Sequence, residues 1–312
     1  MRTRKLGSSG SEISVVGYGS WEAGGMAWGD NPPDAEVVAA MHAAIDAGMT
    51  WIDTAEVYGG GRSEELVGEA LEGHDDVLVF TKVAPKPAGS GFHRAGVRSA
   101  AEASLRRLGR DQIDLLQLHW QDRRVPIEET WEAMASLVED GLVRWIGLSN
   151  FGRELIERCE TIRHVDSLQP HFSMLMHQGG DDLFTFCESN GTGVICYGPL
   201  AFGLLTGRFT KETKFAKNDW RGGGHGIGYY KDLFAPGKFE DNINTVEELR
   251  PIAERIGVSL PQLALAWALH QTGVTGVIAG SRSADHVRDN AGAADVTLDQ
   301  KDLDDIESIL QR

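Results

Sequence analysis

The sequence predicts an α/β protein whose eight parallel strands close into a (β/α)8, or TIM, barrel. Three observations predict this fold: short β-rich runs recur along the 312 residues, amphipathic helical patterns lie between them, and several runs are apolar on both faces. Repeated strand–helix units favour a closed parallel barrel, because each crossover connection returns with the same hand. An open, doubly wound sheet is the alternative, but Gly17-Tyr18-Gly19-Ser20 does not continue as the glycine-rich fingerprint that such a sheet would carry after its first strand.

The expected barrel strands are short and rich in Val, Ile and Leu. In chain order they are Ser14–Tyr18, Thr50–Asp53, Val77–Thr81, Ile113–Leu118, Val143–Leu148, Ser167–Gln169, Val194–Tyr197 and Val277–Ala279. The clearest helical patterns between them are Asp34–Ala47, Arg94–Leu108, Glu128–Glu139 and Gly152–Arg163. Each of these patterns has an apolar face, as a helix that covers a sheet requires.

Two segments depart from the regular repeat. Arg2–Leu6 and Glu12–Ser14, joined around Ser8-Ser9-Gly10, predict a β-hairpin before the first barrel strand. Between the seventh and eighth strands lies a long insertion, whose loop and two extra helices are expected at Thr210–Glu240, Thr245–Ile256 and Leu260–His270. A long loop after a barrel strand lies at the catalytic face, so this loop is a candidate lid or substrate wall. No linker divides the chain, which predicts a single domain over residues 1–312.

The composition is that of a soluble globular protein, with 41% hydrophobic and 24% charged residues. A net charge of −16 argues against nucleic acid as a partner, because most of such a surface would repel it. No run is apolar enough to span a membrane, and the first residues do not resemble a secretory signal. Cys159, Cys187 and Cys196 lack metal-ligand spacing and are interpreted as buried free thiols of a cytoplasmic protein.

Polar side chains follow the predicted strands at the end where barrel enzymes carry out their chemistry. Asp53 and Tyr58 follow the second strand, Lys82 the third and His119 the fourth. The fifth, sixth and seventh strands are followed or ended by Ser149 and Asn150, Gln169, and Tyr197. Each has a purely structural alternative, such as a turn cap for the aspartate or a hydrogen-bonded core histidine. The ends of three adjacent strands carry an aspartate, a tyrosine, a lysine and a histidine, and this combination argues against coincidence.

A proton-donating unit can be formed by Asp53, Tyr58, Lys82 and His119 together. A tyrosine phenol has an unperturbed pKa of about 10, and a neighbouring ammonium is expected to lower it. Asp53 would hold Lys82 in place, and His119 could bind the reacting oxygen or help to pass its proton. We therefore expect a general-acid site that polarises a carbonyl group, with Tyr58 as the acid.

With these residues in place, the chain resembles the aldo-keto reductases over nearly its whole length. IDTAEVYG, VFTKV and DLLQLHW are similar to the motifs that carry the four catalytic residues of the family. GLSN and Gln169 resemble its carboxamide-binding positions, and YGPLAFGLLTGR resembles the segment that stacks on the nicotinamide and follows the pyrophosphate. IAGSRSADHVRDN resembles the adenosine-phosphate segment. The spacing is most similar to bacterial members akin to potassium-channel β-subunits.

The resemblance implies NADP(H) as cofactor and the reduction of aldehydes or ketones to alcohols. The residues that it assigns to cofactor binding are Gly19, Ser20, Trp21, Asp53, Ser149, Asn150, Gln169, Tyr197, Gly198, Pro199, Leu200, Gly203, Leu205, Gly207, Arg208, Gly280, Ser281, Arg282, His286, Asp289 and Asn290. Three of them depart from the commoner residues of the family: Gly198 replaces a serine, His286 a glutamine and Asp289 a glutamate.

The adenosine end of this site can also be argued from the residues themselves. Gly280, Ser281 and Arg282 end the last strand and precede a helix that begins near Ala284. Free amides at a helix N-terminus and a guanidinium group both bind phosphate. Arg282 is therefore expected to favour NADPH over NADH, the alternative being an ordinary surface arginine.

The substrate is expected to be a small carbonyl compound held by aromatic walls. The expected wall residues are Trp21, Trp28, Tyr58, His119, Trp120 and Trp220, together with the loop 210–240. Two other functions stay open: a Schiff-base aldolase that uses Lys82, and a regulatory module that senses NADPH with little turnover. The scattered histidines predict no metal site. The sequence leaves the substrate's identity and the oligomeric state open.

Overall fold

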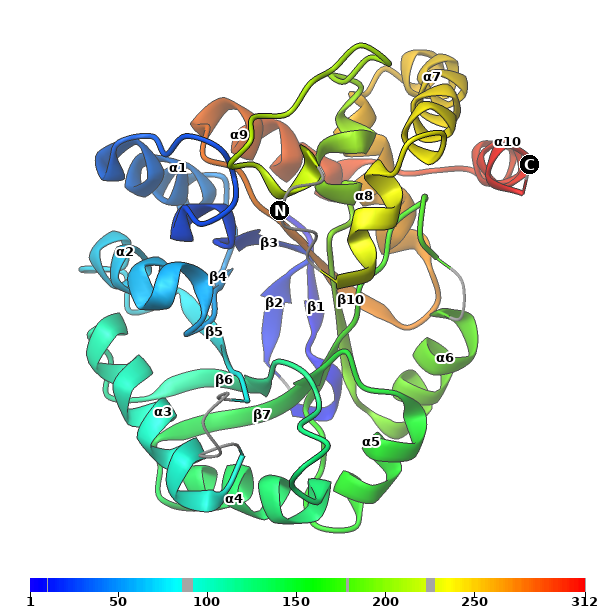
Figure 1. Ribbon diagram of the computed structural model, residues 1–312. Coiled ribbons are helices and arrows are strands. Elements are labelled where there is room, and N and C mark those ends of the chain that lie inside the picture. The colour runs from blue at the N-terminus through cyan, green and yellow to red at the C-terminus, as the bar shows by residue number, and fades with distance from the viewer. Residues whose placement is uncertain (10, 86–91, 178–179, 223–227, 312) are drawn as a thin grey trace.

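The computed structural model describes residues 1–9, 11–85, 92–177, 180–222 and 228–311. Its eight parallel strands form one closed barrel in which the last strand pairs with the first, which confirms the predicted fold (Figure 1). In chain order the barrel strands are β3 (Val16–Gly19), β4 (Trp51–Asp53), β5 (Leu78–Val83), β6 (Ile113–Leu118), β7 (Val143–Ser149), β8 (Ser167–Gln169), β9 (Gly193–Tyr197) and β10 (Val274–Ala279). Gly10 of the predicted hairpin turn and residues 223–227 of the predicted loop lie outside the described residues.

Helices surround the strands on the outside of the barrel (Figure 1). Those that connect consecutive strands are α1 (Asp34–Asp46), α2 (Arg62–Ala70), α3 (Arg94–Leu108), α4 (Ile127–Glu139), α5 (Arg153–Glu160) and α6 (Gly180–Asn190). The remaining helices are α7 (Lys238–Ile256) and α8 (Leu260–His270) before the last strand, and α9 (Ala284–Gly292) and α10 (Gln300–Leu310) after it. The helices predicted from their apolar faces are confirmed to within a few residues at each end.

A cluster of large apolar side chains joins the hairpin to the barrel strands. It consists of Leu6, Ile13, Trp51, Phe80, Leu115, Trp145, Ile195 and Ile278. Ile13 lies in β2 (Glu12–Ser14) and Leu6 directly follows β1 (Thr3–Lys5), so the predicted hairpin packs against side chains of the barrel. Gly17 makes room for an indole, because a Cβ there would lie 2.2 Å from the ring of Trp51. The first barrel strand begins at Val16 instead of Ser14, since Ser14 pairs with Thr3 in the hairpin.

The connection between β9 and β10 passes across the C-terminal mouth of the barrel. It contains the short helical turns η4 (Ala201–Thr206), η5 (Trp220–Gly222) and η6 (Gly228–Phe234) ahead of α7. Asp219 forms a backbone bridge with Trp28, which lies in the loop after β3, so the insertion is fastened to that loop. The prediction that α7 begins at Thr245 is wrong. Gly237 adopts φ +85° and its amide donates to the Glu240 carboxylate at 2.7 Å, which starts the helix earlier.

Candidate active site

Lys82 stands at the centre of the predicted catalytic group. Strand β4, which ends at Asp53, lies beside β5, which carries Lys82, so the two side chains emerge next to each other. The ammonium donates to Asp53 at 2.5 Å, to the Thr54 carbonyl at 2.8 Å and to the Tyr58 hydroxyl at 3.4 Å. A lysine that is 1% exposed needs such partners to remain charged. The structure therefore brings the predicted aspartate, lysine and tyrosine together at one point.

Tyr58 begins the turn η3 (Tyr58–Gly61) and lies between two other rings. Its ring centroid is 6.1 Å from Trp21, in a stacked arrangement, and 5.6 Å from His119, in an edge-on arrangement. The glycines that follow are required by the turn: Gly59 has φ +62°, and a Cβ there would lie 2.2 Å from the carbonyl oxygen of Gly24. The local sequence thus folds back sharply and holds the phenol beside the lysine.

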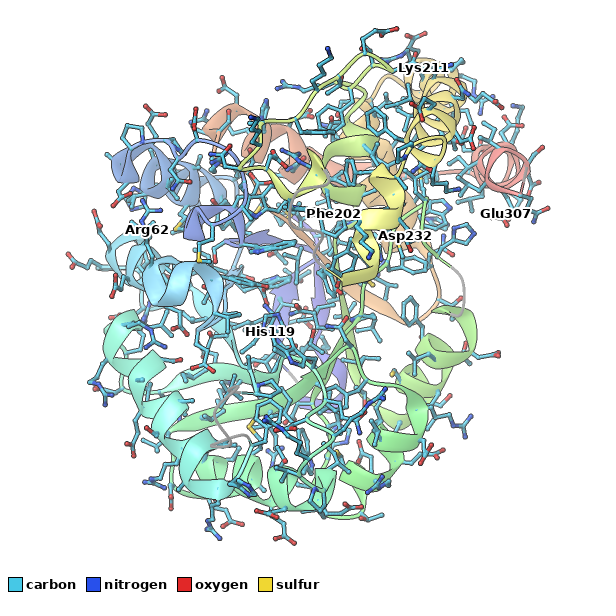
Figure 2. All side chains as sticks on the ribbon, in the orientation of Figure 1. Arg62, His119, Phe202, Lys211, Asp232 and Glu307 are labelled. Carbon is cyan, nitrogen blue, oxygen red and sulfur yellow. The ribbon has the colours of Figure 1, made fainter. Side chains whose placement is uncertain are left out.

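His119 follows strand β6 and completes the catalytic group. Its backbone amide donates to Val83 at 2.9 Å, and its carbonyl accepts the side-chain amide of Asn150 at 3.1 Å. Burial, followed by the positive charge of Lys82, holds the pKa of His119 well below its usual 6.5. The imidazole is therefore neutral near pH 7 and can hydrogen-bond a ligand oxygen without carrying a charge. Figure 2 shows His119 towards the middle of the barrel, whereas Arg62 lies at the periphery.

The pKa of Tyr58 differs from the expectation drawn from the sequence, which was that Lys82 would lower it. Burial of the phenol raises this pKa well above 10, and the neighbouring Asp53 and Tyr230 raise it further. Burial also raises the pKa of Asp53 and lowers that of Lys82, while the attraction between these two groups opposes both shifts. The phenol is therefore fully protonated at neutral pH and available to donate. Lys82 can stabilise the oxygen only as negative charge develops on it.

Two of the predicted cofactor residues, Gln169 and Ser20, form hydrogen bonds with Asp53. Gln169 donates through Nε2 to the second carboxylate oxygen of Asp53 at 2.8 Å, and the Ser20 hydroxyl donates to the Asp53 carbonyl at 2.9 Å. With Lys82 on the first oxygen, the carboxylate is held from two sides. These contacts fix the orientation of the group that in turn positions the lysine.

A cavity of about 560 Å³ extends from Asp53 and Tyr58 to helices α8 and α9. The predicted site residues that line it are Gly19, Trp21, Trp28, Asp53, Tyr58, Tyr197, Gly198, Pro199, Leu200, Gly203, Arg208, Gly280, Ser281, His286, Asp289 and Asn290. The predicted site residues that do not line it are Ser20, Lys82, His119, Trp120, Ser149, Asn150, Gln169, Leu205, Gly207, Trp220 and Arg282. The cavity is thus an elongated site with the catalytic group at one end.

Tyr197 joins a polar group at the catalytic end of the cavity. Its hydroxyl donates to the Asn150 side-chain carbonyl at 2.7 Å and contacts the hydroxyl of Tyr230, which comes from η6. The Asn150 amide also donates to the Ser149 hydroxyl at 3.1 Å. The next residue, Gly198, has φ +68°, a backbone conformation that favours the glycine found there over the serine that is commoner in the family. The two predicted carboxamide-binding residues Ser149 and Asn150 are therefore linked to the aromatic wall of the cavity.

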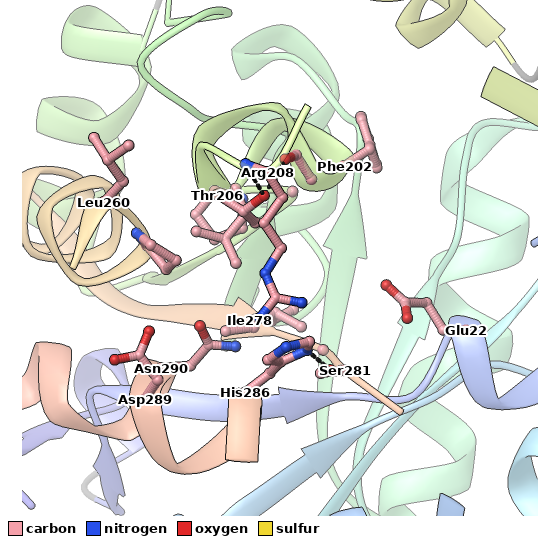
Figure 3. A pocket seen from close by; sticks show the side chains of 18 of the residues that line it. Glu22, Phe202, Thr206, Arg208, Leu260, Ile278, Ser281, His286, Asp289 and Asn290 are labelled. Carbon is pink, nitrogen blue, oxygen red and sulfur yellow. Dashed lines mark hydrogen bonds between the residues drawn. The ribbon is translucent and has the colours of Figure 1, made fainter. Parts of the chain in front are cut away.

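Cationic and polar side chains gather at the opposite end of the cavity. Figure 3 shows the Arg208 guanidinium pointing into the space between Ser281 and the insertion. The Ser281 hydroxyl lies 3.2 Å from Nδ1 of His286. Burial, followed by the charge of Arg208, lowers the pKa of His286, so this imidazole is neutral near pH 7. Asp289 accepts a hydrogen bond at 2.8 Å from Ser259, at the start of α8, and so joins two walls of the cavity.

Arg282 does not take the place that the sequence suggested for it. Its terminal nitrogens donate to the carbonyls of Asp30 at 2.9 Å and Trp28 at 3.2 Å, and its Nε lies 3.8 Å from the Glu22 carboxylate. The guanidinium therefore holds the loop after β3 instead of facing the cavity. Arg208 is the arginine that points into the cavity at this end.

The predicted aromatic walls form one cluster. The Trp21 ring centroid is 4.9 Å from Trp28 and 6.2 Å from Trp220. Trp220 is 1% exposed and packs behind the other two, so it supports the wall without forming its surface. Trp120 lies 4.5 Å from His119 between ring centroids and is 41% exposed, which places it at the outer rim of the site.

Sequence reasoning missed several residues of the cavity wall. They include Glu22, Phe202, Thr206, Phe209, Arg221 and Arg250. Phe202 lies within the quoted segment YGPLAFGLLTGR, and its left-handed backbone (φ +55°) brings its ring within 5.8 Å of Trp21 between centroids. Arg221 forms a two-pronged pair with Asp219 and donates to the Phe202 carbonyl at 3.1 Å. Glu22 directly follows the predicted Trp21, and no local pattern marks the other five residues, because their positions depend on how the insertion between β9 and β10 folds.

No group of three or more His, Cys, Asp or Glu side chains among the described residues could hold a metal ion. Within the same residues, no helix is both long and apolar enough to cross a membrane.

Comparison with known proteins gives consistent matches over the whole chain. The model of the Aldo/keto reductase family matches residues 15–311. The chain is 33% identical to the aldo-keto reductase YhdN of Bacillus subtilis, over 100% of this chain and 94% of that protein. It is 30% identical to a probable voltage-gated potassium channel subunit beta of Oryza sativa, over 100% and 97% of the two chains.

Two solved structures are similar over almost their full length. The glycerol dehydrogenase AKR11B4 from Gluconobacter oxydans aligns with a TM-score of 0.88 and 31% identity, covering 99% of this chain and 95% of that one. An aldo/keto reductase from Klebsiella pneumoniae, solved in complex with NADP and acetate, aligns with a TM-score of 0.76 and 29% identity, covering 99% and 96%.

Proposed function

Because the chain belongs to the aldo/keto reductase family, we propose that it reduces the carbonyl group of an aldehyde or ketone with NADPH, using Tyr58 as general acid. The observation that carries this proposal is the buried Lys82, which joins Asp53 to the Tyr58 hydroxyl at one end of a long cavity. The family and the NADP complex of the Klebsiella relative support NADP(H) as the cofactor.

The catalytic group supplies what carbonyl reduction needs. A carbonyl oxygen placed beside Tyr58 and His119 can accept hydrogen bonds from both side chains. Bound NADPH would supply the hydride for the carbonyl carbon. As negative charge develops on the oxygen, the Tyr58 proton moves to it, and the ammonium of Lys82, at 3.4 Å, stabilises the phenolate that is left. Asp53 keeps the lysine charged and in place throughout.

The cavity fits a phosphate-containing dinucleotide. Gly19 and Gly280 line it at the ends of β3 and β10, where they lack side chains, so a ligand can approach the main chain at these two positions. We assign Tyr197 to the nicotinamide end, and Arg208, Ser281 and His286 to the phosphates of the adenosine end.

The structure argues against the first alternative function, a Schiff-base aldolase, and is compatible with the second, an NADPH-sensing module. A Schiff-base aldolase would need an accessible amine, but the Lys82 side chain is 0% exposed and is engaged by the Asp53 carboxylate. A sensing role with little turnover is favoured by the similarity to the potassium channel subunit. A measurement of turnover distinguishes such a sensor from a reductase.

Arg208→Ala is expected to raise the Kd of NADPH roughly ten- to hundredfold with a smaller effect on NADH. A charge-assisted phosphate contact is worth about 1.5–3 kcal/mol, and 1.4 kcal/mol is a factor of about ten. Arg282→Ala is the matched control: it removes a guanidinium that holds the loop after β3, so it should weaken both cofactors alike. Kd values from tryptophan quenching would check this. If Arg282→Ala selectively weakened NADPH binding and Arg208→Ala did not, Arg282 would be the residue that binds the phosphate.

At saturating NADPH, kcat for reduction is expected to be constant from about pH 6.5 to about pH 9.5. The pKa of Tyr58 is raised, so the acid is lost only as the pH rises above this window, and the pKa of His119 is lowered, so its neutral form is lost only below it. Oxidation of the corresponding alcohol needs the phenolate and should rise with pH across the same window. A reduction profile that falls with an apparent pKa near 7 to 8 would show that the phenol is not held in its protonated form.

A further inference from the structure

Glu22 is a carboxylate in the wall of a cavity that is also lined by three arginines. It follows Trp21 directly and begins the turn η2 (Glu22–Gly24) after strand β3. Its side chain is 31% exposed, and Figure 3 shows the carboxylate turned towards the cavity that Arg208 enters from the other side. Arg221 and Arg250 also line the cavity. Neither the catalytic group nor the family motifs account for an acid at this position.

The groups around this carboxylate leave it without a close partner. Arg282 is nearest, with Nε at 3.8 Å, but its terminal nitrogens are committed to the carbonyls of Asp30 and Trp28. Arg221 is likewise committed to Asp219, at 2.9 and 2.6 Å. Among the described residues, no donor lies within hydrogen-bonding distance of the Glu22 carboxylate. It is therefore available to a ligand in the cavity.

The charges that face Glu22 come from every neighbouring element. Burial raises its pKa most, Arg282 after β10 and Arg221 of the insertion oppose that rise, and Asp219 adds to it. Tyr18 of strand β3 is buried and protonated, since burial and the charge of Glu22 raise its pKa. Across the cavity lie Arg208 and His286, whose imidazole is neutral near pH 7. The carboxylate is thus already held less firmly in its charged form than an exposed glutamate.

The position of Glu22 along the cavity indicates which part of a ligand reaches it. On one side its neighbour Trp21 stacks against Tyr58 at the catalytic end. On the other side the wall continues through Ser281 to His286 at the opposite end. A dinucleotide that fills the cavity therefore brings phosphate oxygens into the space between Glu22 and Arg208. A second negative charge there would repel an ionised carboxylate.

We propose that Glu22 is a cofactor-contacting residue that takes up one proton from solvent when a dinucleotide binds, so that its neutral carboxyl group donates a hydrogen bond to a phosphate oxygen. The inference rests on the proposed use of a nicotinamide dinucleotide. Uptake of the proton makes binding of the cofactor tighter as the pH falls, so Glu22 sets the cofactor affinity at neutral and alkaline pH.

Titration calorimetry of the wild-type protein tests the proton directly. NADPH and NADH would each be titrated at pH 7.5 in two buffers of different ionisation enthalpy, which gives the number of protons bound per cofactor. The same titrations with Glu22→Gln, which mimics the neutral carboxyl group, should show an uptake that is smaller by most of one proton. Because the 2′-phosphate of NADPH titrates equally with both proteins, the difference between them isolates Glu22.

The Kd values give a second readout. Uptake of most of one proton requires the pKa of Glu22 to rise by about two units on binding, and each unit corresponds to a tenfold change in affinity. Glu22→Gln should therefore bind roughly a hundredfold more tightly than wild type at pH 8 and about equally at pH 5.5. Asp30→Asn is the matched control: it removes one negative charge from the same loop at a side chain that does not line the cavity, and it should leave the pH dependence unchanged. Tightening of both cofactors would assign the contact to the pyrophosphate, and tightening of NADPH alone would assign it to the 2′-phosphate.

Different results would overturn the two proposals. If both proteins bind the cofactors with equal proton uptake and equal affinity at pH 8, Glu22 stays ionised and the inference is wrong, while the proposed function stands. If neither NADPH nor NADH binds to the wild-type protein, the proposed function itself fails and the inference fails with it.

Discussion

Replacing Tyr58 by Phe is expected to lower the rate of carbonyl reduction at least a hundredfold while leaving NADPH affinity nearly unchanged. The substitution removes one oxygen and keeps the ring that packs against Trp21 and His119. General acid–base groups contribute about 10²–10⁴ in rate. The lost interaction matters only as negative charge develops on the carbonyl oxygen, so binding in the ground state should hardly change.

The measurement is kcat with a reactive aldehyde under conditions where chemistry limits the rate, with the cofactor Kd determined separately. Tyr18→Phe is the matched control, because it removes the same oxygen from a buried tyrosine that donates to the Ser281 carbonyl outside the catalytic group. This variant should keep most of its turnover. If Tyr58→Phe retains more than about a tenth of the wild-type rate, it falls outside the range for a general acid and Tyr58 only packs.

Lys82→Met is expected to cause a loss of similar size for a different reason. The phenol stays in place, but the phenolate formed during reduction loses the ammonium that lies 3.4 Å away in a buried site. The variant also leaves Asp53 as a buried charge without its partner, and breaking a buried pair costs about 3–5 kcal/mol of stability. Lys82→Met combined with Asp53→Asn removes both charges and should recover stability without recovering turnover.

Combining the substitutions at Tyr58 and Lys82 tests whether they act as one unit. If both dismantle the same proton donor, the double variant should be little slower than either single variant. Thermal unfolding should be followed for all of these proteins, so that loss of fold is not mistaken for loss of chemistry. Fully additive losses in kcat would mean that Lys82 acts independently of the phenol, and the proton-donating unit described above would not exist.

The barrel and the catalytic group could be predicted because local patterns determine them. A strand that is apolar on both faces, such as β6 with Leu115 and Leu116, can be recognised without tertiary information. The fold then places the ends of adjacent parallel strands side by side, so Asp53 and Lys82 had to meet once the strands were correctly located. The turn after Tyr58 is equally local, because only glycines allow it.

The direction of a long side chain could not be predicted in the same way. Arg282 lies within the predicted phosphate segment, but its guanidinium donates to the carbonyls of Asp30 and Trp28, more than 250 positions away, and does not line the cavity. The pKa of Tyr58 was misjudged because the sequence shows its charged neighbours and not its depth of burial, which is the larger effect. Glu22 was missed because it lies one residue beyond Gly19, Ser20 and Trp21, the last residues assigned to the cofactor in this part of the chain.

The central claim is that NADPH is consumed in reducing a carbonyl group, and single-turnover kinetics test it most directly. The protein would be loaded with slightly less than one equivalent of NADPH and mixed with a panel of aldehydes and ketones, with cofactor absorbance and alcohol product both measured. The account predicts loss of NADPH and formation of one alcohol per NADPH with at least one small aldehyde, and a rate at least about a hundredfold lower for Tyr58→Phe. Tight NADPH binding with no consumption by any compound of the panel would contradict it and would favour a cofactor-sensing role.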